Sequence, residues 1–145
     1  MSDPLYKKDL LRLAANAVGA GRLERADSSA TVQNPACGDR VTVDLAMENG
    51  RIAGIAHQTH GCVLTQASAA ILGADATGLD RAGVAALAQA VRAMLKGGAA
   101  PMAPFDIYGV FDGAAGHAGR HTCVLLPLEA VLKALDVLEP AKPGA

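Results

Sequence analysis

Three cysteines and one acidic residue are the side chains of this sequence best suited to binding a metal. Cys37 lies in the segment Asn-Pro-Ala-Cys-Gly-Asp, and Asp39 follows two residues later. Cys62 lies in a Gly-Cys turn, and Cys123 lies far downstream in RHTCVLL. Thiolates suit Zn²⁺ and iron–sulfur centres, and a carboxylate can complete such a site. We therefore expect the fold to bring Cys37, Asp39, Cys62 and Cys123 together around a metal ion or an iron–sulfur cluster.

The surroundings of the cysteines support this hypothesis better than their spacing does. Intervals of 25 and 61 residues, by subtraction, are not typical of zinc fingers, and a free cysteine can also pack as a small hydrophobic residue. The Pro and Gly around Cys37 disfavour helix and strand there. Cys62 lies at the start of a predicted helix, where backbone N–H groups favour a thiolate, and Cys123 lies close ahead of another.

Two histidines lie near the cysteines in sequence. His60 comes two residues before Cys62, and His121 comes two residues before Cys123, so either side chain could approach the site or remain solvated. His57 falls within a predicted strand, where a surface or packed role is expected. No serine has the G-x-S-x-G context of a serine hydrolase, and no GxGxxG or Walker pattern indicates a nucleotide site.

The composition predicts a single globular domain over residues 1–145. Apolar residues make up 51% of the chain and charged residues 19%, and the formal net charge is −1. This charge and the scarcity of aromatic residues give no reason to expect nucleic acid. The N-terminus lacks a secretory signal, and the longest uncharged run, 52–74, contains polar residues and a turn, so no membrane span is expected. An odd number of cysteines without a CxxC pair favours free thiols in the cytoplasm.

The first half of the chain predicts a helix followed by strands. Apolar residues recur at helical spacing after Asp3 and Pro4, and Gly19 ends that pattern. Residues 30–33 form a short predicted strand. Residues 40–48 alternate between apolar and polar, with Asp44 on the solvated face, and Asn49-Gly50 predicts a two-residue hairpin turn.

The hairpin turn fixes a predicted register between the two strands. Met47 should face Ile52 and Glu48 should pair with Arg51, with the pairs Leu45–Gly54 and Val43–Ala56 further along. In this register Ile55 falls on the face opposite Ile52. Either both faces of the second strand are partly covered, or a β-bulge shifts the register.

The second half predicts helices, so the whole is α+β, with a small antiparallel sheet and helices packed on one side. One helix begins near Cys62 and ends at Gly73. The next is capped by Asp80, has an apolar stripe and ends at Gly97. Residues 105–111 should form a helical turn or a packed loop, and Pro127 should begin the last helix.

These segments together resemble a known family. NPACGDRV, the ENGRI hairpin, THGCVLTQAS and a late cysteine before an amphipathic helix are similar to the U-type iron–sulfur cluster assembly scaffolds, namely the IscU, SufU and amino-terminal NifU proteins. The wide interval between Cys62 and Cys123, which holds the helix near 81–96, resembles the SufU branch. The resemblance implies a three-stranded antiparallel sheet with packed helices (SufE/NifU-like).

The resemblance also implies the ligands and the partners. The family's ligands fall on Cys37, Asp39, Cys62 and Cys123. Thr122 stands where the IscU branch has a histidine directly before the last cysteine, so a histidine ligand is not carried over. The LPPVK-like segment that binds a dedicated chaperone is absent. The implied partners are a SufS-like cysteine desulfurase and apo iron–sulfur proteins.

Three functions follow from this site. The first is a non-enzymatic scaffold that accepts sulfur and iron, builds a transient [2Fe–2S] cluster and transfers it to apo-proteins. There, the Asp39 oxygen should make the cluster labile, because oxygen suits cluster iron less well than sulfur. The second is a Zn²⁺-dependent sulfur acceptor, with sulfurtransferase activity, in which Cys123 takes the persulfide because its glycine-rich approach could swing out. The third is a structural zinc site in an interaction domain.

Overall fold

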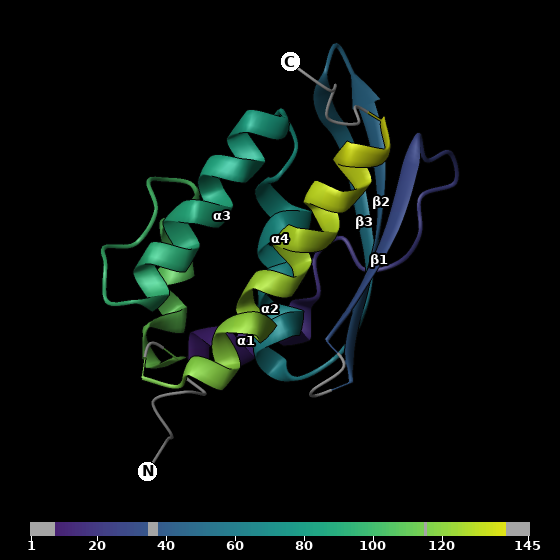
Figure 1. Ribbon diagram of the computed structural model, residues 1–145. Helices are drawn as coiled ribbons and strands as arrows, with labels where there is room; N and C mark the ends of the chain where they lie inside the picture. Colours follow the sequence, from purple (N-terminus) through teal and green to yellow (C-terminus); the bar gives the residue numbers. More distant parts are fainter. Residues whose placement is uncertain (1–7, 35–37, 115, 139–145) are drawn as a thin grey trace.

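A sheet of consecutive strands is preceded by one helix and followed by the rest of the helices (Figure 1). The computed structural model describes residues 8–34, 38–114 and 116–138. In chain order the elements are α1 (Lys8–Asn16), β1 (Ser28–Asn34), β2 (Asp39–Glu48), β3 (Arg51–His60), α2 (Val63–Asp75), α3 (Arg81–Leu95), the 3₁₀ helix η2 (Phe105–Ala114) and α4 (Ala118–Leu138). The predicted helix near 81–96 is therefore confirmed as α3, and the segment 105–111 forms the first part of η2.

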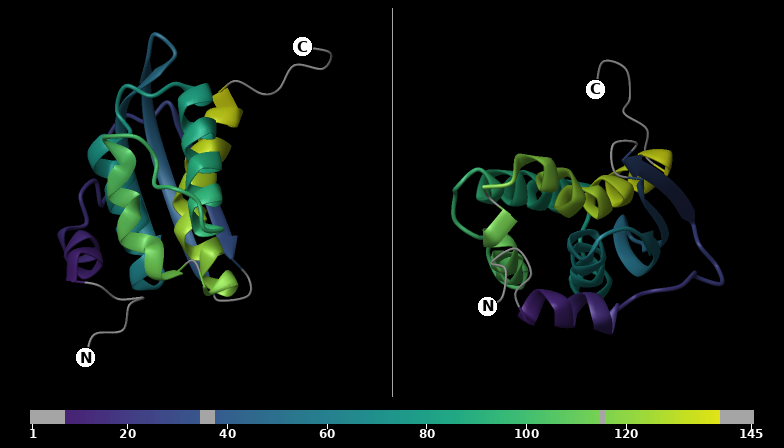
Figure 2. Two further views of the ribbon diagram at one scale, coloured as in Figure 1. Left: turned by 90° about the vertical axis from the view of Figure 1, so that its left-hand side faces the viewer. Right: turned by 90° about the horizontal axis from the view of Figure 1, so that it is seen from below.

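The predicted three-stranded antiparallel sheet with packed helices is confirmed. The strands lie in the order β1-β2-β3, and both neighbouring pairs are antiparallel. α4 packs on β1 and β2, α2 packs on β3, and α3 packs on α4 from the side away from the sheet (Figures 1 and 2). Val41, Val43 and Leu45 of β2 are at most 1% exposed, which places the core between the sheet and the helices.

The hairpin turn forms at Asn49-Gly50, as predicted. Both residues have positive φ, 56° and 78°, the conformation that a type I′ turn requires. Met47 faces Ile52 and Glu48 pairs with Arg51. The sequence prediction for the end of the hairpin is therefore confirmed.

Beyond these pairs a β-bulge changes the register. The ladder shifts between Ala46 and Met47, so Leu45 faces Ile55 instead of Gly54, and Val43 faces His57 instead of Ala56. The predicted pairs were wrong because the extra residue leaves one position of β3 unpaired. The bulge was one of the two alternatives, and it places Ile55 on the same face as Ile52, toward the helices.

The outer face of the sheet is less exposed than the alternating pattern predicts. Asp44 was expected on the solvated face, but its side chain is 1% exposed. The Arg22 guanidinium donates to both carboxylate oxygens, at 2.6 and 3.0 Å, and the Leu23 N–H and the Ser29 hydroxyl also donate to Asp44. The segment before β1 thus covers this face, and the hydrogen bonds from Arg22 lower the pKa of Asp44.

The α3 helix follows its predicted boundaries closely. The Asp80 side chain accepts a hydrogen bond from the Gly83 N–H at 2.8 Å, which confirms the N-cap. The predicted buried stripe is confirmed at Val84, Leu87, Ala88, Val91 and Leu95. Gly97 follows the helix with φ of 102°.

The boundaries of the other helices differ from the prediction. α2 continues to Asp75 and so passes through Gly73, which was expected to end it. A Cβ at Gly73 would collide with the Val18 carbonyl oxygen, so this glycine lets the segment after α1 lie against α2. The expected caps of the first helix, Asp3 and Pro4, lie outside the described residues.

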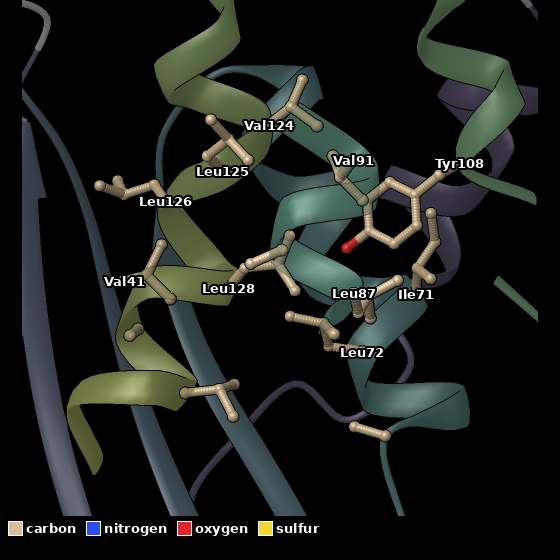
Figure 3. Packing of buried hydrophobic residues seen from close by; sticks show 14 of the residues in the cluster. Val41, Ile71, Leu72, Leu87, Val91, Tyr108, Val124, Leu125, Leu126 and Leu128 are labelled. Carbon is tan, nitrogen blue, oxygen red and sulfur yellow. The ribbon is translucent and has the colours of Figure 1, made fainter. Parts of the chain in front are cut away.

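The last helix begins nine residues before the predicted start. α4 runs from Ala118, so Pro127 lies inside it and not at its first turn. A proline inside a helix removes a backbone hydrogen bond and costs roughly 3 kcal/mol, which normally argues against such a position. Every residue from Cys123 to Leu128 is buried, however, and Figure 3 shows Val124, Leu125, Leu126 and Leu128 within the packed core. Burial of this apolar segment overrides the cost of the proline.

Among the described residues, no helix combines the length and apolarity that a membrane span requires.

Candidate metal centre

Three of the four predicted ligands meet at one end of the sheet. One ligand atom each from Asp39, Cys62 and Cys123 can be chosen so that all lie within 4.8 Å of one another. These residues belong to three different elements: the first residue of β2, the N-cap of α2 and the interior of α4. Within the part of the chain that the structure describes, this is the group of His, Cys, Asp and Glu residues close enough to share an ion.

The alternation of β2 directs Asp39 toward the helices. Asp39 precedes Val41 and Val43 at a spacing of two, so its side chain lies on the same face as these buried residues. Asp39 is 6% exposed. A carboxylate is therefore held at the edge of an apolar interface, where an isolated charge is costly and a cation or a hydrogen-bond donor is favourable.

Cys62 is positioned by the start of α2, as predicted. Its backbone has φ of −71° and ψ of 172°, and its carbonyl accepts from the Gln66 N–H at 3.0 Å. The side chain of this N-cap makes no capping hydrogen bond. The Cys62 sulfur therefore lies at the positive end of α2 without being used to cap the helix, which suits it to bind a metal.

Cys123 lies within α4 and not ahead of a helix, which corrects the prediction. It is 1% exposed. Burial raises the pKa of the Cys123 thiol to about 12, and the neighbouring Cys62 and Asp39 raise it further in the same direction. Without a cation, this sulfur is protonated at neutral pH.

Cys37 lies outside the described residues, so its role as a ligand stays a prediction. The structure describes the residues that flank the 35–37 segment: the Gly38 N–H donates to the Asn34 carbonyl at 2.8 Å, and Asn34 pairs with Asp39. Two residues separate the Cα atoms of Cys37 and Asp39 by no more than about 7 Å. The chain connectivity is thus compatible with a fourth ligand at residue 37.

Two further residues shape the site, and sequence reasoning missed both. The Thr65 hydroxyl donates to Asp39 Oδ2 at 2.6 Å and lies 3.6 Å from the Cys62 sulfur. A Cβ at Gly61 would lie 2.9 Å from Asp39 Cγ, so the glycine provides room for the carboxylate. The available signal for Thr65 was its position three residues after Cys62, one helical turn along the same face.

The histidines lie outside this group of ligands. His60 is exposed at the end of β3, and His121 Nε2 donates to the Ala114 carbonyl at 3.1 Å. His57 is a packed residue, one of the two roles expected for it: it is 4% exposed, and its Nε2 donates to the Val18 carbonyl at 2.8 Å. Burial lowers the pKa of His57.

The chemistry of the donor set fits a thiophilic metal. Two sulfurs and one carboxylate, from residues fixed by secondary structure, can provide three ligands to Zn²⁺ or to iron. Three thiolates and one carboxylate, with Cys37 included, would carry four negative charges. Either Zn²⁺ or a [2Fe–2S]²⁺ unit would reduce this charge to −2, which makes the assembled site compatible with burial.

Comparison with known proteins identifies relatives of this chain. The model of the NifU-like N terminal domain family matches residues 5–106, which is more than half of the chain and includes Cys37, Asp39 and Cys62. Two iron–sulfur cluster assembly scaffold proteins of Archaeoglobus fulgidus, IscU 1 and IscU 2, are each 36% identical over 67 residues. That alignment covers 46% of this chain and 44% of each relative, so the chain matches less than half the length of these proteins.

Solved structures extend the similarity to nearly the whole chain. The N-terminal part of a nitrogen-fixing NifU-like protein from Brucella abortus is 33% identical, with a TM-score of 0.89 over 96% of this chain and 98% of that one. A putative iron–sulfur cluster assembly scaffold protein for the SUF system from Fervidobacterium islandicum is 22% identical, with a TM-score of 0.81 over 93% of this chain and 99% of that one. The second likeness shows the fold alone.

Proposed function

The chain belongs to the NifU-like N-terminal domain family, and from this premise we propose that it is a scaffold for iron–sulfur cluster assembly. In this proposal iron and sulfur are its cargo: they are collected at Cys37, Asp39, Cys62 and Cys123 and passed to apo-proteins as a [2Fe–2S] cluster. The observation that carries the proposal is the convergence of Asp39, Cys62 and Cys123 within 4.8 Å from three separate elements. The two Archaeoglobus relatives are themselves named as iron–sulfur cluster assembly scaffold proteins.

The ligand set suits a site that must release what it holds. Thiolates bind cluster iron firmly, whereas the Asp39 oxygen is the poorer match and the ligand most readily displaced. Cys123 gives up its proton when iron binds, since burial otherwise keeps it as a thiol. Binding of iron is therefore coupled to loss of a proton from the protein. Release of the cluster should begin with dissociation of the Asp39 carboxylate.

The sulfur source in this proposal is a cysteine desulfurase. A thiolate of the scaffold attacks the outer sulfur of the desulfurase persulfide, the S–S bond breaks, and the desulfurase cysteine leaves as a thiolate. The sulfur must then gain two electrons from an external thiol reductant to become the sulfide of a cluster. The proposed partners are therefore a cysteine desulfurase, which supplies sulfur, and apo-proteins, which receive the cluster.

Cys123 remains the candidate for the thiol that receives the persulfide, but the reason given from the sequence is wrong. The glycine-rich approach was expected to swing out, whereas Cys123 lies in the body of α4 and is 1% exposed. The test is mass spectrometry of peptides after treatment with desulfurase and cysteine. A persulfide on Cys37 or Cys62, with none on Cys123, would reject the assignment.

Anaerobic reconstitution tests the scaffold function. The protein is incubated with ferrous iron, cysteine, a cysteine desulfurase and a dithiol reductant, and iron, acid-labile sulfide and the visible spectrum are then measured. We expect a brown protein with equal amounts of iron and sulfide, and transfer of the cluster to an added apo-ferredoxin. The Cys62→Ser variant should remain folded and fail to hold the cluster.

Zinc content separates the alternatives. Protein that stays colourless under these reconstitution conditions, and keeps one tightly bound zinc instead of iron and sulfide, would reject the scaffold proposal. If that zinc protein stimulated the desulfurase, it would be the sulfur acceptor expected as the second reading. If it did not, the site would be structural.

A further inference from the structure

Thr65 connects the carboxylate and one thiol of the candidate metal centre. It is fully buried at the first turn of α2, and its Oγ1 lies 2.6 Å from Asp39 Oδ2 and 3.6 Å from the Cys62 sulfur. The Asp39 carboxylate has no proton to donate when ionised, so the hydroxyl must be the donor in that contact. The single proton of Thr65 is therefore committed to Asp39.

The remaining contact of Thr65 then has a fixed direction. With its proton given to Asp39, Oγ1 can only accept, and the thiol of Cys62 can donate to it. The hydrogen bonds therefore run from Cys62 through Thr65 to Asp39, and the bond from Thr65 is the one that holds the carboxylate.

We propose that Thr65 is a positioning residue, which holds the Asp39 carboxylate beside the thiols and thereby sets the affinity of the site for metal. This inference rests on the proposed metal-binding function. A hydrogen bond to a carboxylate ligand from a neighbouring residue fixes its orientation, and loss of such a bond costs about 10- to 100-fold in metal affinity. Gly61 provides the space for this orientation, because a Cβ there would lie 2.9 Å from Asp39 Cγ.

Zinc affinity of the Thr65→Val variant tests the proposal. Valine has nearly the shape of threonine but cannot donate, so the carboxylate loses the hydrogen bond from residue 65. We expect zinc affinity, measured anaerobically by competition with a chromophoric chelator, to fall by about 10- to 100-fold. Thr65→Ser keeps the hydroxyl and should restore an affinity close to that of the wild type.

A double-mutant cycle identifies the partner through which Thr65 acts. Asp39→Ala alone should weaken zinc binding, and addition of Thr65→Val to it should produce no further loss. A purely structural role would not give this result, because damage to α2 would weaken binding with or without Asp39. If the valine variant does not fold, Thr65→Ala can be used in the same cycle.

Ser28→Ala is the matched control. The Ser28 hydroxyl is also buried and donates to the Ala134 carbonyl at 2.6 Å. Ser28 pairs with Leu45, six residues along β2 from Asp39, or about 20 Å from the site. Loss of this hydroxyl should lower stability and leave zinc affinity unchanged.

Three results would overturn the inference, and two others would reject the proposed site itself. Wild-type affinity in Thr65→Val would show that the hydroxyl does not set affinity. An equal loss in the Asp39→Ala background would show that Thr65 acts independently of the carboxylate. A similar loss in Ser28→Ala would assign the effect to general destabilisation. If instead the wild type binds no zinc, or if Asp39→Ala binds as tightly as the wild type, the proposed metal site fails before Thr65 is considered.

Discussion

Among the residues that the structure describes, every buried polar side-chain atom has a hydrogen-bond partner. Asp44 is ionised under the outer face of the sheet because Arg22 and two further donors surround it. Asp39 is buried at the metal centre, where Thr65 donates to it. His57 differs from these because the hydrogen bonds of its ring go to uncharged groups, the Thr59 hydroxyl and the Val18 carbonyl, so its burial favours the neutral ring.

His57 should make stability depend on pH in the weakly acidic range. Its folded-state pKa is lowered, whereas in the unfolded chain it is about 6.5. The unfolded state therefore binds more protons below this value, so stability is complete above about pH 6.5 and decreases as the pH falls. Urea unfolding at pH 7.5 and pH 5.5 should show this loss in the wild type and a smaller loss in His57→Gln, whose amide can still donate to Val18.

The exposed residue His117 provides the control for this prediction. His117→Gln should retain the pH dependence of the wild type. An equal dependence in His57→Gln would assign the effect to other groups. The acid transition of Asp44 does not interfere, since its lowered pKa places its loss of stabilisation well below pH 5.5.

At the scale of elements, the sequence predicted what depends on local pattern. The Asn49-Gly50 turn, the Asp80 cap and the apolar stripe of α3 depend on neighbours within a few positions, and the structure confirms them. The start of α4 depends on tertiary burial instead. Pro127 is a strong local argument for a helix start, and only the contacts of α4 with the sheet, α2 and α3 outweigh it.

The features of the candidate site likewise divide into those that local sequence predicts and those that depend on tertiary contacts. The position of Cys62 at a helix N-terminus follows from the Gly-Cys turn before an apolar run, and it could be predicted. The place of Cys123 inside α4 and the contact between Thr65 and Asp39 join elements that are distant in sequence. No local pattern specifies such contacts, so they could not be derived from the residues alone.

Docking of the segment after α1 against α2 leads to a prediction for Gly73. The Val18 carbonyl lies where a Cβ of residue 73 would be, and the His57 ring donates to the same carbonyl. Gly73→Ala should therefore separate these segments and lower the free energy of unfolding by about 1–3 kcal/mol, since the backbone must move. Urea unfolding measures this.

Gly119→Ala is the matched substitution for comparison. Gly119 lies near the start of α4, and apart from its chain neighbours and the backbone of its own helix, no heavy atom of the described residues lies within 4 Å of its would-be Cβ. Alanine there should leave stability equal or raise it by up to about 1 kcal/mol. Equal stability of Gly73→Ala and the wild type would contradict the close approach of Val18.

At the scale of the molecule, the fold brings one residue from each of three separate elements together at the candidate metal centre. β2 contributes a carboxylate, α2 a thiol at its positive end, and α4 a thiol from its buried face. Each element is fixed by the core, whose residues from the helices and β2 pack together (Figure 3). The site is therefore assembled only in the folded state, and a metal that binds it must stabilise the whole fold.

Zinc should consequently raise the stability of the entire domain. A ligand that binds only the folded state stabilises it by about 4 kcal/mol at a free concentration 1,000 times its Kd. Urea unfolding with and without zinc, under anaerobic conditions, should show this increment in the wild type and a much smaller one in Cys62→Ser. The increment should grow as pH rises toward 8, because binding displaces protons from thiols, including that of Cys123. As a control, Ser28→Ala should be less stable without zinc and should gain as much free energy of unfolding from zinc as the wild type. If Cys62→Ser gained as much as the wild type, the zinc would bind elsewhere on the protein.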